Sequence, residues 1–121
     1  MSTAVNNELD GAFAALKRIL IKLAAGRHVV HDDITHYYLN SARSDAKGKA
    51  VFFAAAKIGA KKVAFHLMPV YENPALLEGI SGALKQRMQG KSCFNFNAPD
   101  EALMQELEAL AQSCAKADIA A

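Results

Sequence analysis

Apolar side chains recur with a helical period near both ends of the chain. Near the N-terminus the spacing is four, three, four and three, through Leu9, Phe13, Leu16, Leu20 and Leu23. This is one stripe of an amphipathic helix, which we expect from about 7 to 25, ended by Gly26. A second long helix is expected to begin near Asp100 and to fray after Lys116. Its stripe has the spacing four, three and four, through Leu103, Leu107, Leu110 and Cys114.

Between these helices the apolar period drops to two, which is typical of strands. Four segments show this pattern: 28–40, 50–58, 62–71 and 92–97. The first is expected to divide into two short strands at Asp32–Asp33. The polar stretch 41–49 is expected to be a loop, and Gly59–Ala60 a hairpin turn.

Two short helices are expected before the last strand. Asn73 and Pro74 have the character of a cap followed by a first-turn proline, which predicts a helical turn through Leu77. Ser81 can cap a second short helix that Gly90 closes.

This order of segments lacks the strand–helix alternation of a parallel α/β fold. We therefore expect one α+β domain over residues 1–121, built as an antiparallel sheet of about five strands. The N- and C-terminal helices each have one apolar stripe to bury, so both are expected on the same face of the sheet. The other face is then open, or is covered by another subunit.

Composition narrows the class of protein. At 121 residues and 52% hydrophobic content, the chain is long enough for one core. The net charge of +2 is too small to argue for a nucleic-acid partner, although 41–91 carries nine Lys or Arg against three acids. No apolar run approaches the ~20 residues of a membrane span, and the first residues lack a signal-peptide pattern. Two cysteines, Cys93 and Cys114, do not make a disulfide framework, so we expect a cytoplasmic protein with free thiols.

Strand alternation selects the side chains that the open face would display. If Phe65 and Phe94 pack under the helices, their neighbours along each strand point the other way. A tyrosine hydroxyl, from Tyr37 or Tyr38, would join them, depending on the register. The expected residues for a small polar ligand are Tyr38, His66, Met68, Cys93 and Asn95. The alternative is that His66 and Cys93 are partly buried structural residues.

A cluster of imidazoles and carboxylates near the first strands is the candidate metal site. Its main members are His28, His31 and Asp32, and these side-chain types bind ferrous iron or zinc. In a regular strand His28 and Asp32 share one face and His31 lies on the other. The three converge only if a turn folds them together, and otherwise form a surface cluster.

Cys93 is the candidate nucleophile. Activation of a thiol requires a histidine within hydrogen-bond reach and a lowered thiol pKa. Cys93 lies within a predicted strand, away from any helix N-terminus, and no third orienting residue is identifiable. A cysteine-dependent enzyme is therefore the weaker alternative.

Two stretches, FHLMPVYENPALL (65–77) and LKQRMQGKSCFNF (84–96), resemble the YdhG-like domains of unknown function. The resemblance extends from Leu16 to about Leu110 and implies an antiparallel sheet backed by helices. Some relatives are described as frataxin-like iron chaperones, which use acidic side chains on a helix and a neighbouring strand. Here the first helix carries Lys17, Arg18 and Lys22 where those acids are expected. The resemblance thus implies iron binding only as an alternative.

These observations favour a non-enzymatic binding or interaction domain that uses the open sheet face for a small ligand or a subunit. The alternative is an iron-handling chaperone. We also expect a homodimer, because Met68, Tyr38 and Phe53 would leave an apolar patch on the open face, and such patches are seldom left uncovered.

Overall fold

The computed structural model describes the backbone of residues 3–120 and the side chains of residues 8–118. The elements, in chain order, are α1 (Thr3–Ile21), β1 (His28–Asp32), β2 (His36–Ser44), β3 (Ala50–Ile58), β4 (Val63–Leu67), α2 (Met68–Glu72), η1 (Pro74–Leu77), α3 (Gly82–Lys85), β5 (Cys93–Phe96) and α4 (Glu101–Ala120). None of the helices within residues 3–120 has the length and apolar character needed to cross a membrane.

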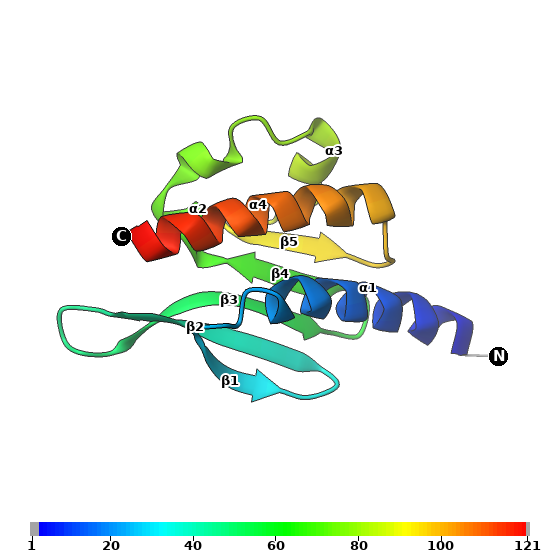
Figure 1. Ribbon diagram of the computed structural model, residues 1–121. Helices are drawn as coiled ribbons and strands as arrows, with labels where there is room; N and C mark the ends of the chain where they lie inside the picture. The colour runs from blue at the N-terminus through cyan, green and yellow to red at the C-terminus, as the bar shows by residue number, and fades with distance from the viewer. Residues whose placement is uncertain (1–2, 121) are drawn as a thin grey trace.

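All five strands belong to one antiparallel sheet whose spatial order is the order of the chain, β1-β2-β3-β4-β5. The helices α1 and α4 lie side by side across one face of this sheet (Figure 1). The short helices α2, η1 and α3 come before β5. The expected α+β fold, with both long helices on the same face, is confirmed.

The hydrophobic core fills the space between the two long helices and the sheet. The predicted stripes point into it, as shown by the fully buried Leu16 of α1 and Leu107 of α4. From the sheet come Phe65, Phe94 and Phe96, which are also buried. The inward assignment of these phenylalanines is therefore correct, and their strand neighbours face the opposite side.

The strand predicted for 62–71 is too long. The strand β4 ends at Leu67, and Met68 begins the short helix α2, with Pro69 in its first turn. Proline has no N–H to give to a sheet, and its fixed φ suits the start of a helix. Met68 therefore does not stand on the open face of a strand, and its predicted position was wrong.

Three other boundaries differ from the predictions. The helix α1 ends at Ile21, and Gly26 has the left-handed φ of 79° in the turns that follow. The strand β2 continues to Ser44, through part of the predicted loop, and α4 continues to Ala120 where fraying was expected. The last two differences share a cause, since Ser41 and Asp118 bond to one another.

The segment before β5 follows the predictions only in part, since Asn73 precedes η1 without a side-chain capping bond and α3 ends at Lys85 and not near Gly90. The hydroxyl oxygen of Ser81 accepts a hydrogen bond from the N–H of Leu84 at 3.1 Å, which fixes the start of α3. Leu84 is buried in the core. Met88 lies beyond the helix and bridges to Phe94, so residues 86–89 run along the outer edge of β5.

Candidate functional site

One row of paired residues crosses all five strands on the face away from the helices. The strand register pairs His31 with Tyr38, Tyr38 with Ala55, Ala55 with His66 and His66 with Cys93. The structure thus brings together three of the five predicted ligand-binding residues: Tyr38, His66 and Cys93.

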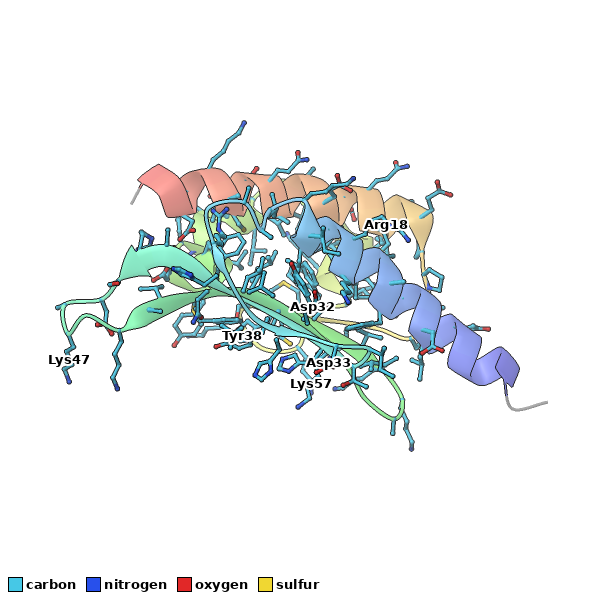
Figure 2. The ribbon with its side chains drawn as sticks, turned by 60° about the horizontal axis from the view of Figure 1, so that its bottom comes forward. Arg18, Asp32, Asp33, Tyr38, Lys47 and Lys57 are labelled. Carbon is cyan, nitrogen blue, oxygen red and sulfur yellow. The ribbon has the colours of Figure 1, made fainter. Side chains whose placement is uncertain are left out.

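A second row runs beside the first. It pairs His36 with Lys57, Lys57 with Ala64 and Ala64 with Asn95. In Figure 2 the labelled Tyr38 and Lys57 extend from the sheet on the side away from α4. Both rows therefore belong to the open face.

A depression of about 450 Å³ lies between these rows. Its floor is formed by the small side chains of Ala55 and Ala64. Around the floor stand the larger side chains His36, Tyr38, Phe52, Lys57, His66 and Cys93. We call this site the open-face depression.

The rings around the open-face depression form one contiguous aromatic cluster. The centroids of Tyr38 and Phe52 are 4.7 Å apart, and those of Phe52 and His66 are 5.1 Å apart in a T-shaped contact. His31 and His36 stack at 4.7 Å, and each meets Tyr38 edge-on. Such a cluster offers both ring faces and ring edges to a ligand.

Phe52 was missed by the sequence reasoning, which placed Phe53 on this face. The register shifts in β3, because Leu39 pairs with Ala54 whereas Asn40 pairs with Phe52. This β-bulge inserts Phe53 as an extra residue and turns its side chain into the core. Phe52 takes the outward position instead. His36 and Lys57 were also missed, although alternation from Tyr38 and Ala55 places both on the same face.

His66 is a neutral side chain at physiological pH. Burial lowers the pKa of His66 below its ordinary 6.5, and its Nε2 atom lies 2.6 Å from the Ser92 hydroxyl. Burial also lowers the pKa of His36, and the positive charges of His31 and Lys57 add to that effect.

Cys93 is a half-buried thiol beside His66 in the register. Burial raises the pKa of Cys93, and the ammonium of Lys62 only partly offsets that effect. The thiol is therefore mostly protonated near neutral pH, which is the opposite of what a nucleophile requires. Both cysteines are free, as expected, and the second, Cys114, is buried in α4.

Asn95 is on the expected face but is engaged. Its side-chain N–H donates to the side-chain oxygen Oε1 of Gln89 at 2.6 Å, and Lys62 donates to the same oxygen at 2.9 Å. Met68, at the start of α2, does not line the open-face depression. These two predicted residues are therefore outside the site.

The candidate metal ligands do not converge. Asp32 pairs with the buried Tyr37, and its carboxylate forms an ion pair with Lys17 of α1 at 2.7 Å, which places it on the helix side. His31 pairs with Tyr38 on the open side, so the two side chains are separated by the sheet. Within the described residues, no group of three His, Cys, Asp or Glu side chains is arranged to hold a metal ion.

A second polar cluster lies on the helix side, around Asp118 near the end of α4. The Asp118 carboxylate accepts hydrogen bonds from Arg27 at 2.9 and 3.1 Å, from Arg43 at 2.9 Å and from Ser41 at 2.9 Å. The Arg27 guanidinium also lies 4.1 Å from the centroid of the Phe53 ring. Asp118 is only 4% exposed. Its bonding groups are used within the protein, so this cluster acts as a structural anchor.

Comparisons of the chain with protein-family models, with curated proteins and with solved structures found no match. The resemblance to YdhG-like domains therefore stays a prediction. The functional argument rests on the geometry of the open-face depression.

Proposed function

We propose that the protein is a non-enzymatic binding domain that holds a small ligand in the open-face depression. The supporting observation is the row His31–Tyr38–Ala55–His66–Cys93, which places aromatic and polar side chains from all five strands on one face. The depression has the volume of small-molecule sites, which are typically about 300–1,000 Å³.

The chemistry of the lining favours binding over catalysis. His66 is neutral, Cys93 is a protonated thiol, and the two are joined to no orienting carboxylate among the described residues. Such groups supply hydrogen bonds and apolar contact. The imidazole of His66 is not paired with the thiol as its base, because its Nε2 atom is bonded to the Ser92 hydroxyl, and burial keeps Cys93 protonated.

The test is to fill the depression without removing any contact. Ala64→Leu adds bulk to its floor, whereas Ala42→Leu adds the same bulk at an exposed position of β2 outside it. Ligand-induced amide shifts in two-dimensional NMR should map to β2–β5 around Tyr38, Phe52 and His66. They should vanish in Ala64→Leu and persist in Ala42→Leu. Shifts that map to the Asp118 cluster, or that survive Ala64→Leu, would show that the open face is not the site.

A second copy of the chain is the other candidate occupant of the open face. Apolar side chains are also exposed at the edge strand β1 and its turn, where Val30 is 47% exposed and Ile34 is 88% exposed. Pairing of two such faces about a twofold axis would cover them. Val29 pairs with the core residue Leu39 and is therefore on the helix side.

This second candidate is tested by light scattering over a wide concentration range. The wild-type protein should be a dimer at micromolar concentration, and Phe52→Lys should be a monomer with the same thermal midpoint. A monomer mass at every concentration for the wild type would remove the second copy from consideration.

Iron handling is the remaining alternative, and it rests on the resemblance to YdhG-like domains. Anaerobic titration with ferrous iron separates it from the other two. A defined stoichiometry that is lost in His31→Ala would favour it. Weak binding without a stoichiometry would leave the open-face depression as the functional site.

A further inference from the structure

The shape of the open-face depression favours a flat ligand. Its floor consists of two alanines, one on β3 and one on β4, so nothing bulky rises from its centre. Two of the surrounding rings, Tyr38 and Phe52, are inclined by only 34° to one another, and His66 stands nearly at right angles to Phe52. A planar ring placed on this floor would lie beside the rings of Tyr38, Phe52 and His66 and could contact them.

The charges around the depression are positive. Lys57 lines it, close enough to His36 for its charge to act on that imidazole. Lys62 lies outside the depression and donates to the side-chain oxygen of Gln89 at 2.9 Å, but its charge also acts on Cys93. Among the described residues, no Asp or Glu lines the depression. The nearby Asp33 accepts hydrogen bonds from the N–H and hydroxyl of Thr35, both at 2.9 Å, within its own turn.

We infer that the open-face depression binds a free, planar aromatic anion, with the ring over Ala55 and Ala64 and the anionic group at Lys57. This inference rests on the proposed function and adds the class of ligand. The depression is large enough for one ring system with one anionic substituent, which is the size of a mononucleotide.

The neutral polar groups of the site complete the match to a heteroaromatic ring. The imidazole of His66, held through Nε2 by Ser92, and the thiol of Cys93 lie beside the floor. His36 adds another neutral imidazole near Lys57. These groups can exchange hydrogen bonds with ring nitrogens and carbonyl groups without adding charge.

The experiment uses four probes with the full chain, followed by isothermal calorimetry and by NMR amide shifts. Adenosine monophosphate has both the ring and the charge, adenosine has the ring alone, and ribose 5-phosphate has the charge alone. The fourth probe, a single-stranded oligonucleotide, has the same ring and charge as parts of a polymer. Adenosine monophosphate should bind about tenfold more tightly than either partial probe, because it uses both the rings and the ammonium group of Lys57.

The variants separate the two contributions. Lys57→Gln should weaken adenosine monophosphate about tenfold and leave adenosine unchanged, whereas Phe52→Ala should weaken both. Lys116→Gln, which removes an exposed charge from α4, is the matched control and should change neither.

The possible outcomes distinguish the class of ligand from the site itself. Adenosine binding as tightly as its monophosphate, with Lys57→Gln silent, would overturn the anionic class but keep the open-face site. Equal binding of ribose 5-phosphate would show an adventitious anion contact and also overturn the inference. Tighter, salt-dependent binding of the oligonucleotide per nucleotide would identify a single strand as the ligand and overturn the commitment to a free molecule. If no probe perturbs the open face, the inference fails while the proposed function stands for ligands of another class. If a probe binds with amide shifts that survive Ala64→Leu, the inference and the proposed function fail together.

Discussion

Asp118→Ala removes the carboxylate to which three side chains from distant parts of the chain are bonded. Arg27 follows α1, and Ser41 and Arg43 belong to β2, so the substitution releases the end of α4 from both. The largest cost of this substitution is expected from the guanidinium of Arg27. Its side chain is 6% exposed, and the ion pair with Asp118 at 2.9 Å is its charged contact.

The size of the effect follows from that burial. Removing one partner of a buried ion pair leaves an uncompensated charge and typically costs about 3–5 kcal/mol. Arg43 adds little, because its side chain is 29% exposed and Glu72 lies 3.7 Å away as a second partner. We therefore expect a loss of about 3–5 kcal/mol in the free energy of unfolding. At about 4 °C per kcal/mol for a domain of this size, the thermal midpoint should fall by about 12–20 °C.

Urea unfolding followed by far-UV circular dichroism measures the loss directly. Glu101→Ala removes an exposed carboxylate from the same helix and should cost no more than about 1 kcal/mol. Asp118→Asn keeps the shape and one acceptor oxygen but not the charge, so its midpoint should lie between those of Asp118→Ala and the wild type. If Asp118→Ala loses less than about 1 kcal/mol, the carboxylate is solvated and the anchor does not exist.

Three further predictions concern the sheet and the thiols. Phe94→Ala should cost about 3–5 kcal/mol in urea unfolding because Phe94 is fully buried, and an unchanged midpoint would invert the assignment of the faces. Because burial lowers the pKa of His66 in the folded protein, its contribution to stability is complete above pH 6.5 and is lost as the pH falls through the folded pKa. His66→Gln should therefore reduce the fall of the urea midpoint between about pH 7 and pH 5. The reduction should be partial, because the pKa of His36 is lowered in the same direction. A pH dependence identical to that of the wild type would contradict this prediction. Iodoacetamide should label Cys93 slowly at neutral pH and faster as the pH rises. Cys114, whose pKa burial raises to about 12, should react only on unfolding. Rapid labelling of Cys93 at neutral pH would contradict this and would favour Cys93 as a nucleophile.

Local patterns were sufficient for the face assignments of β4 and β5. With Phe65 and Phe94 turned inward, alternation alone places His66 and Cys93 outward, and the register then sets them beside one another. The same reasoning was available for Lys57 and His36. The position predicted for Met68 was wrong although a local signal was available, because Pro69 is typical of the first turn of a helix.

The remaining differences depend on contacts that no local pattern contains. The bulge that turns Phe53 inward and Phe52 outward is a register shift between β2 and β3. Because Phe52 and Phe53 are both phenylalanine, the sequence does not indicate which of them faces the core. The tail after Lys116 was expected to fray because terminal residues usually do. Residues 117–120 instead continue α4, and Asp118 in this segment meets Ser41 and Arg27, which lie 77 and 91 residues earlier in the chain.

These two non-local features are connected, and the connection reaches the open face of the sheet. Asp118 holds the guanidinium of Arg27, and that guanidinium covers the ring of Phe53 at 4.1 Å on the helix side of the sheet. Phe53 is the extra residue of the bulge, so its inward position is what leaves Phe52 outward beside Tyr38. The aromatic cluster of the open-face depression is therefore linked through Phe53 to an ion pair on the opposite side of the sheet. A change in that ion pair is expected to shift Phe52 as well as to lower the stability of the fold.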